Sequence, residues 1–395
     1  MVDKAQQPLL RWLSVPHRIA LMYAAMFFVT GVSTPFLPVW FASRGFSAVE
    51  IGLLAILPQI VRSMFAPAVG FEADRRLSHR ALTIGLSGLG LIGWLWLWWN
   101  SGFGAALAAM VLIALSNTLL PLVESIAMSG VRSEGHNYGR MRLWGSAGYV
   151  AANLMSGWLD DRSGPAWLIA LMAAGAAATF AASLLLPQPA DLATDRGPAS
   201  RLTWASAHAV LRVPMMPAFL VASGCLQGAH GMYYTYGTLN WQAQQIDPAW
   251  FGMLWAVGLI TEISLFWWSS TVIARLGAAG LMAAGAVLSV FRWTLMSFDP
   301  PLGVLMPLQL LHGLTFGASH LGAVHVLSHI APRDRTATAQ ALYSLASTAG
   351  IVIATALAAR LYPAVGGTAY LAMAIMAAIG LMAAILIQRT TSRMQ

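Results

Sequence analysis

The feature that most constrains this chain is a series of apolar segments, each about 20 residues long, that recurs along its whole length. An α-helix rises about 1.5 Å per residue, so a segment of that length crosses the hydrocarbon core of a bilayer. Of the 395 residues, 58% are hydrophobic and only 9% are charged, against roughly 25% charged residues in soluble domains. The sequence therefore excludes a soluble globular protein and predicts one that crosses a membrane many times.

The apolar segments predict an all-α integral membrane protein with twelve transmembrane helices in two six-helix halves. The expected spans are 18–42, 48–71, 80–99, 103–128, 141–160, 165–187, 214–241, 250–273, 277–297, 302–329, 336–360 and 366–388. The halves are 1–187 and 214–395, and a polar cytoplasmic linker at 188–213 joins them. The first segment is long enough to span and is not followed by a signal-peptide cleavage pattern, so we expect it to be retained.

The basic residues predict the orientation of these spans. Most loop Lys and Arg residues flank one face, whereas Arg44, Arg162 and Arg360 flank the other. Because cytoplasmic loops are enriched in Lys and Arg, we expect both termini in the cytoplasm and the protein in the cell inner membrane. The net charge of +8 therefore reflects topology, and no nucleic-acid partner is expected. A single cysteine, Cys225, supplies neither a disulfide nor a thiolate metal site.

Charged side chains within the predicted spans are few. Four lie centrally, Arg62, Glu124, Glu262 and Arg292, while Arg142 lies nearer the cytoplasmic end of its span. A charge at mid-bilayer costs about 2.5 to 3.5 kcal/mol, so such residues should line a cavity and find partners. Glu124 and Arg142 flank one loop symmetrically and should lie at similar depth. They are either a substrate-binding pair or a structural ion pair.

Two predicted helices carry polar and aromatic stripes at helical spacing. One comprises Gln227, His230, Tyr234, Thr238 and Trp241, and the other Gln309, His312, Phe316 and His320. Hydrogen-bond donors beside aromatic surface would suit an amphipathic aromatic acid. Helix-packing hydrogen bonds are the alternative role for the histidines. Since no acidic or thiol ligand joins the histidines, we expect no metal, and no cofactor is implied.

The segment from Gly70 to Arg75 resembles the loop signature of the major facilitator superfamily, with Ser78 in place of its second glycine. The resemblance implies a cytoplasmic conformational latch formed by Gly70, Asp74 and Arg75. Ordinary loop charge is the alternative. A similar Ala-Arg pair, Ala274-Arg275, occupies the same loop of the second half, as parallel repeats would require.

Four stretches resemble the phenylpropionate permease family, itself similar to the lactose permease. They are Tyr138 to Gly145, Leu226 to Tyr234, Trp255 to Glu262, and Gln309 to His320. With the twelve-span plan, the resemblance covers nearly the entire chain. It implies the major facilitator fold and transport of a small organic solute by alternating access.

The same resemblance implies roles for individual residues. Glu124 and Arg142 match a sugar-binding pair of the lactose permease. Glu262, Arg292 and His312 match residues of its binding and coupling machinery. The glutamate that carries the coupling proton there falls at Thr315 here. Either Glu262 carries the proton itself, His312 or His320 contributes, or coupling is absent.

We therefore predict a secondary transporter, not an enzyme, most simply a monomeric proton symporter whose partners are its solute, protons and the lipid bilayer. The favoured solute is an aromatic carboxylate such as 3-phenylpropionate, bound by Glu124, Arg142, Arg62, Gln227, His230, Tyr234 and Trp255. Any of Arg62, Arg142 and Arg292 would meet a carboxylate bidentately, and the sequence does not choose between them. The alternatives are a sugar or nucleoside permease, a membrane-embedded acyltransferase with a histidine base, and a receptor without flux.

Overall fold

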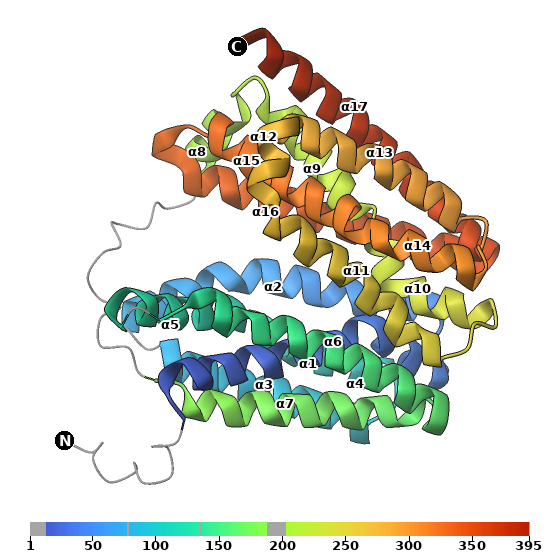
Figure 1. Cartoon of the computed structure of the whole chain (residues 1–395). Coiled ribbons are helices and arrows are strands. Elements are labelled where there is room, and N and C mark those ends of the chain that lie inside the picture. The colour runs from blue at the N-terminus through green and yellow to red at the C-terminus, as the bar shows by residue number, and fades with distance from the viewer. Residues whose placement is uncertain (1–12, 77–78, 135, 188–202, 395) are drawn as a thin grey trace. The chain divides into compact units, whose positions relative to one another are not determined.

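The computed structural model describes residues 13–76, 79–134, 136–187 and 203–394, and every regular element within these ranges is a helix (Figure 1). The side chains of 74–76, 132–134 and 391–394 fall outside the description. The prediction of an all-α protein is confirmed for the part of the chain that the structure describes.

The helices follow the predicted spans closely. In the first half they are α1 (Val15–Ser43), α2 (Ala48–Arg76), α3 (His79–Trp99), α4 (Phe103–Ser116), α5 (Leu119–Glu134), α6 (Tyr138–Ser163), the short η1 (Pro165–Trp167) and α7 (Leu168–Leu185). In the second half they are α8 (Trp204–Leu211), α9 (Met216–Gly228), α10 (Gly231–Ala243), α11 (Ala249–Trp267), α12 (Ser269–Leu276), α13 (Ala278–Met296), α14 (Leu302–His312), η2 (Gly313–Gly317), α15 (Ala318–Ile330), η3 (Arg333–Arg335), α16 (Thr336–Val365), η4 (Gly366–Ala369) and α17 (Tyr370–Met394).

The length and apolar composition of each helix indicate whether it can cross a membrane. Among the described residues, nine helical segments are long and apolar enough to cross a membrane, or up to ten if one bent pair is counted. The segment Arg333–Thr390 counts once although it contains both α16 and α17, and α6 is not counted. Polar residues within α6, such as Ser146, Tyr149 and Asn153, lower its mean hydropathy and account for its omission. Twelve spans remain a prediction.

Two helical features were not expected from the sequence. The predicted linker contains α8, which meets the helical stretch Met216–Ala243 at 93°. The second feature is η2, a π-helical turn between α14 and α15. A π-turn accommodates one residue more than an α-turn and is frequent at functional sites.

The described chain divides into two compact units. One comprises Met1–Arg44 and Leu57–Gly197, and the other comprises Gly45–Ile56 and Pro198–Gln395. The first turns of α2 thus group with the second unit, where the Tyr236 hydroxyl donates to the carbonyl oxygen of Ala48 over 2.6 Å. The domain boundaries expected from the sequence stay predictions.

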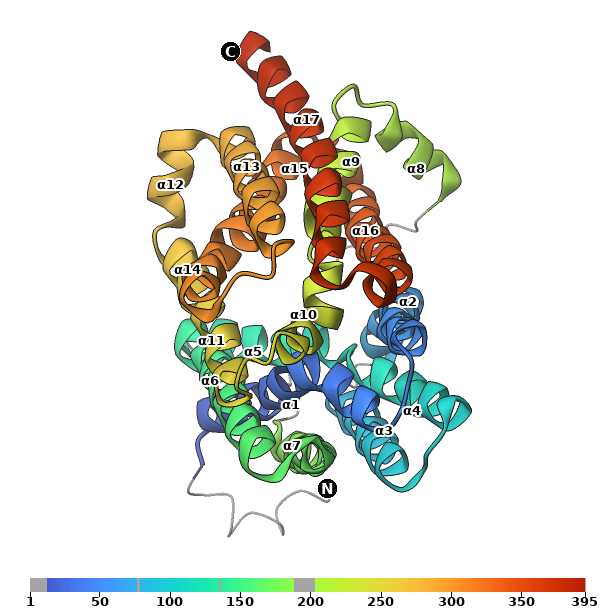
Figure 2. The ribbon, with the colours of Figure 1, turned by 90° about the vertical axis from the view of Figure 1, so that its right-hand side faces the viewer.

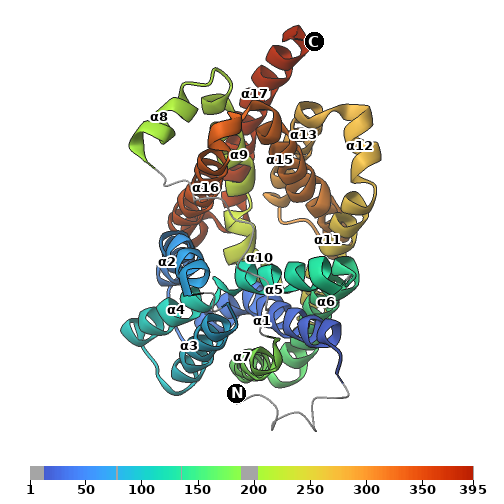
Figure 3. The ribbon, with the colours of Figure 1, turned by 90° about the vertical axis from the view of Figure 1, so that its left-hand side faces the viewer.

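Each unit is built on close helix packing. In the first, α1 lies against α6 and α7, and α3 lies against α4 and α7 (Figure 2). In the second, α9 lies against α16 and α17, and α13 lies against α15 and α17 (Figure 3). The crossing of α9 and α16 requires glycine, since a Cβ atom on Gly350 would lie 1.9 Å from the carbonyl oxygen of Gly224. Small residues at such crossings let membrane helices approach closely.

The predicted cytoplasmic latch is only partly described. A Cβ atom on Gly70 would meet nothing within 4 Å among the described residues. Asp74 and Arg75 lie at the end of α2, but their side chains fall outside the described part of the chain. Their latch role stays a prediction.

Candidate functional site

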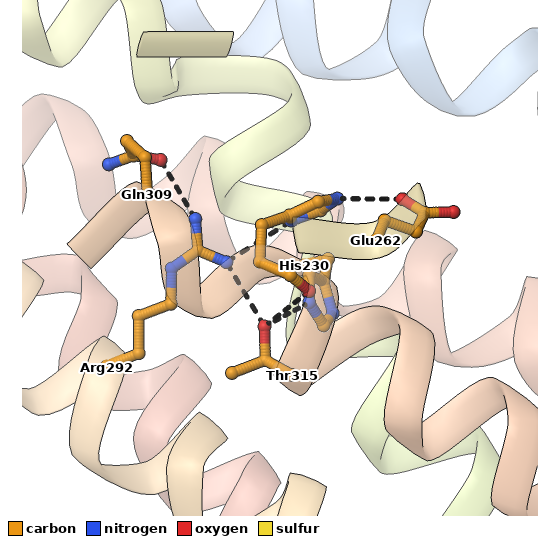
Figure 4. A network of polar contacts seen from close by, with 6 residues as sticks. His230, Glu262, Arg292, Gln309 and Thr315 are labelled. Carbon is orange, nitrogen blue, oxygen red and sulfur yellow. Dashed lines mark hydrogen bonds and ion pairs between the residues drawn. The ribbon is translucent and has the colours of Figure 1, made fainter. Parts of the chain in front are cut away.

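The second unit contains a polar network centred on Arg292, which α13 holds in a fully buried position (Figure 4). One terminal nitrogen, Nη2, donates to Gln309 Oε1 over 2.9 Å. The other, Nη1, lies 3.2 Å from both Thr315 Oγ1 and His312 Nδ1. The hydrogen-bond acceptors that this arginine finds within the described chain include no carboxylate.

His312 links Arg292 to an acid. Its Nδ1 faces the guanidinium, and its Nε2 lies 3.9 Å from Glu262 Oε2. The two side chains are 13% and 20% exposed, so this edge of the network is less buried than Arg292. His230 approaches from the other side, with Nε2 at 3.3 Å from Thr315 Oγ1 and Nδ1 at 3.0 Å from the Leu226 carbonyl oxygen.

Aromatic rings surround this network. The guanidinium carbon of Arg292 lies 4.9 Å from the centre of the Tyr233 ring and 4.6 Å from that of Trp293, distances typical of cation–π contacts. Tyr234 places its ring 6.1 Å from His312 and 6.2 Å from Trp255. The network is therefore a cation and an acid enclosed by flat apolar surface.

The predicted stripe on α14, η2 and α15 is present as a column of rings. His312 stacks on Phe316 with centroids 5.5 Å apart and planes at 5°, and Phe316 stacks on His320 at 6.1 Å and 11°. His320 then bonds through Nδ1 to the Tyr343 hydroxyl over 2.8 Å. This contact ties the column to α16.

Two glycines allow α11 to lie close to the end of α14, which bears His312, and to the start of η2. A Cβ atom on Gly313 would lie 2.4 Å from the backbone nitrogen of Glu262, and one on Gly258 would lie 3.0 Å from His312 Cβ. Close packing between these helices therefore holds Glu262 and His312 in place, in addition to the hydrogen bonds of the network.

We predict that Gly313→Ala destabilises the protein, because its methyl group would overlap backbone of α11 that no rotamer change can move. Gly303→Ala is the matched control, since a Cβ atom on this α14 glycine meets nothing within 4 Å. Thermal unfolding of both variants in detergent checks this expectation. Equal transition temperatures for both would show that α11 and η2 adjust freely.

The first unit holds a second, smaller group around Glu124 and Arg142. The Tyr138 hydroxyl donates to Glu124 Oε1 over 3.3 Å. Arg142 lies instead over the Phe27 ring, 4.1 Å from its centre, and 5.6 Å from that of Tyr23. Both charges act electrostatically on Tyr23 and Tyr138, so they surround the same tyrosine pair. The structural ion pair considered for them is not formed among the described contacts.

The other predicted site residues occupy different surroundings. Arg62 is exposed on α2 and donates to Gln59 Oε1 over 3.0 Å. Trp255 is buried and donates from Nε1 to Thr238 Oγ1 over 3.0 Å. Gln227 is buried on α9, and its Nε2 has no hydrogen-bond partner among the residues that the structure describes. The structure brings His230, Tyr234, Trp255, Glu262, Arg292 and His312 together in one unit.

Sequence reasoning assigned no site role to Thr315, Tyr233 or Trp293, although all three contact Arg292. The signal for Thr315 in the sequence was that it occupies the position where the lactose permease has an acid. Spacing alone could have found it, since it follows His312 by three residues. Tyr233 and Trp293 are chain neighbours of predicted residues, and no pattern marked them.

Comparison with known proteins identifies the family. The sequence model described as the MFS_1 like family matches residues 17–386. This chain belongs to that family. Its fold class is the major facilitator fold, and the nucleoside transporter NupG has a solved structure that superimposes with a TM-score of 0.80, at 16% identity, over 95% of this chain and 99% of that one. At that identity the likeness concerns the fold alone.

Relatives by sequence are transporters. The "Probable 3-phenylpropionic acid transporter" of Escherichia coli (strain K12) is 30% identical over 377 residues, which cover 93% of this chain and 95% of the relative. The "Maltose permease" of Geobacillus stearothermophilus is 29% identical over 334 residues, covering 82% of each chain. The prediction of a multi-pass membrane transporter that moves a small solute and is not an enzyme is confirmed.

Proposed function

We propose that the protein is a proton symporter of aromatic carboxylates in the cell inner membrane, acting as a monomer with both termini in the cytoplasm. The observation that carries the proposal is Arg292, a buried cation with uncharged hydrogen-bond acceptors and aromatic rings beside it. A buried guanidinium gains most from a carboxylate partner, which it binds bidentately. The relative named as a probable 3-phenylpropionic acid transporter supports the same solute class.

Among the three arginines that the sequence offered, Arg292 suits an anion best. Arg62 is exposed and bonded to Gln59. Arg142 shares its tyrosine pair with the Glu124 carboxylate, whose charge opposes an incoming anion. Of these three described arginines, Arg292 is the one that is fully buried among aromatic rings.

Ligand screening tests this proposal. Purified protein is heated with 3-phenylpropionate, maltose or a nucleoside, since a ligand that binds the native state raises the apparent unfolding temperature. We expect 3-phenylpropionate to give the largest shift, and reconstituted protein to exchange labelled 3-phenylpropionate by counterflow. A shift with maltose alone would contradict the proposal.

Tyr234 should contribute to selection for an aromatic ring. Its half-buried ring faces His312 and Trp255, where a solute ring would stack. We predict that Tyr234→Ala weakens aromatic acids by about 0.5 to 1.5 kcal/mol beyond the lost contact area, and short aliphatic acids much less. Competition binding with paired aromatic and aliphatic acids measures the difference. If Tyr234→Ala weakened binding of both kinds of acid equally, the solute ring would not lie against Tyr234.

A second candidate function is uptake of a hydroxylated solute such as a sugar. Tyr138, Glu124 and Arg142 offer hydroxyl, carboxylate and guanidinium groups beside the Phe27 ring, and one relative is named a maltose permease. Under this alternative, Arg142→Lys keeps the charge but loses the planar fork, so sugar affinity should fall while protein abundance stays normal. Unchanged sugar affinity would exclude the pair as the binding site.

A further inference from the structure

The short helix α8 runs in a different direction from the predicted spans of the second unit. It meets the helical stretch Met216–Ala243 at 93°, and only residues 212–215 separate the two. That stretch occupies the predicted span 214–241, so a helix at a right angle to it lies along the membrane surface. Figure 2 shows α8 at the periphery of the second unit, next to α16.

One side of α8 is buried in the protein and the other is open. Val210 is fully buried, and α8 packs against α16 and α9. Trp204, His208 and Leu211 are exposed, the tryptophan to 92% and the leucine to 41%. Their spacings of four and three residues place them on one face of the helix, and the exposed Arg212 continues this face at the C-terminal end.

The open face of α8 has two chemically different edges. With a rotation of about 100° per residue, Leu211 and Trp204 form one edge, Arg212 forms the other, and His208 lies between them. Apolar side chains beside a cation are typical of helices that lie in the membrane interface. Tryptophan in particular is enriched at the level of the lipid headgroups.

Exposed charges fix the depth of α8. An exposed arginine is costly in hydrocarbon, so Arg212 places the C-terminal end of α8 at the headgroups. Arg275 and Arg333 are exposed at the same end of the unit, and Asp334 is paired with Arg335. The described charges near α8 are therefore mainly positive, which suits an acidic lipid surface.

We propose that α8 is a membrane-surface anchor that binds acidic phospholipids. Trp204 and Leu211 enter the boundary between headgroups and acyl chains, and Arg212 binds the lipid phosphate through its planar fork of donors. The inference goes beyond the proposed function and does not depend on the identity of the solute.

Two features favour lipid over a soluble protein as the occupant of this face. Residues 212–215 reach at most about 14 Å when extended, so α8 stays at the membrane edge. Val221 on α9 and Leu345 on α16 are 47% and 59% exposed, so both helices that support α8 present apolar side chains outward. The open face thus continues a surface that already contacts lipid.

A nitroxide on α8 tests where this face lies. Cys225 is the only cysteine of the sequence, so Leu211→Cys in a Cys225→Ser background carries one label. In nanodiscs that contain phosphatidylglycerol, its collisions with oxygen and with a polar nickel chelate report its depth. Asp334→Cys, at a position 71% exposed, is the water reference, and Leu345→Cys is the acyl-chain reference. We expect the Leu211 label to lie between the two references, and Trp204→Ala to shift it toward water.

The preference for acidic lipid is tested with a label at Ala205, which leaves Trp204, Leu211 and Arg212 in place. Phosphatidylglycerol or phosphatidylcholine is titrated into the detergent-solubilised protein while the mobility of the label is recorded. We expect phosphatidylglycerol to immobilise the label at lower concentration. Arg212→Gln should need about fivefold more of it, the contribution of one basic residue near an acidic surface. Arg275→Gln, which removes an exposed cation from α12, should respond as the unmodified protein does.

Three results would overturn the inference. A Leu211 label as accessible to the nickel chelate as the Asp334 label would place α8 in water, where a soluble protein would be its partner. Equal responses to the two lipids, or an unchanged response of Arg212→Gln, would remove the acidic headgroup. Immobilisation by glycerol 3-phosphate alone would show an anion site that needs no membrane. Neither measurement involves solute transport, so failure of the proposed function would leave the inference intact.

Discussion

Arg292→Gln should weaken binding of 3-phenylpropionate by about 3 kcal/mol, or roughly 100-fold, because the solute carboxylate loses a buried, charge-assisted partner. Glutamine keeps an amide that can donate a hydrogen bond, and it removes the buried charge, so we expect a limited cost to folding. Isothermal titration of the purified protein gives both dissociation constants. Arg275→Gln is the control, since this arginine is exposed on α12 and should leave affinity unchanged.

A complementary variant keeps Arg292 and supplies it with an internal anion. Thr315 Oγ1 lies 3.2 Å from Arg292 Nη1, so Thr315→Glu places a carboxylate in the position proposed for the solute. We expect it to exclude 3-phenylpropionate as effectively as the loss of the arginine does. Thr315→Gln has nearly the same size without the charge and should bind appreciably better. Equal affinities for the two variants would show that crowding, not charge, closes the site.

Glu262→Gln should abolish proton-driven accumulation while equilibrium exchange of labelled solute continues. Exchange needs only the binding site and the change of access, whereas accumulation also needs a proton bound together with the solute. Removing the Glu262 charge removes the carboxylate that faces His312 Nε2 at 3.9 Å and would stabilise an imidazolium.

Proteoliposomes with an imposed pH gradient measure accumulation, and the same vesicles without a gradient measure exchange. Asp334→Asn serves as the control, because this acid is 71% exposed and pairs with Arg335. Normal accumulation by Glu262→Gln would show that the acid has no part in coupling. Loss of both activities together would indicate a role in the binding site itself.

The helices were predictable because the information that defines them is local. An apolar run such as 302–329 specifies a membrane helix without reference to the rest of the chain, and α14, η2 and α15 occupy nearly the same range. Intramembrane charges were predictable for the same reason, since their cost makes each one conspicuous. Arg292 and Glu262 were therefore selected from the sequence, whereas His312 was selected from the polar stripe on its helix and from the resemblance to the lactose permease.

Their arrangement was not predictable, because it depends on contacts between distant segments. Arg292 and Thr315 meet only when α13 packs against η2. The sequence suggested that Glu124 faces Arg142, yet Glu124 accepts from Tyr138 and Arg142 lies over Phe27. An aromatic ring attracts an arginine as a carboxylate does, and the spacing of Glu124 and Arg142 along the chain does not decide which partner the arginine takes.

The π-turn at Gly313–Gly317 implies an unusual tolerance of a change in chain length. Such a turn holds one residue beyond the α-helical repeat, so a single-residue deletion within it restores an ordinary α-helix without breaking the chain. Because the widened turn absorbs the extra residue locally, the side chains on either side of it already have nearly the directions of a continuous α-helix. After the deletion, His320 would therefore stay beside Tyr343 and His312 beside Arg292. Insertions and deletions are usually tolerated in loops, and here the tolerant point would lie in the middle of a membrane helix.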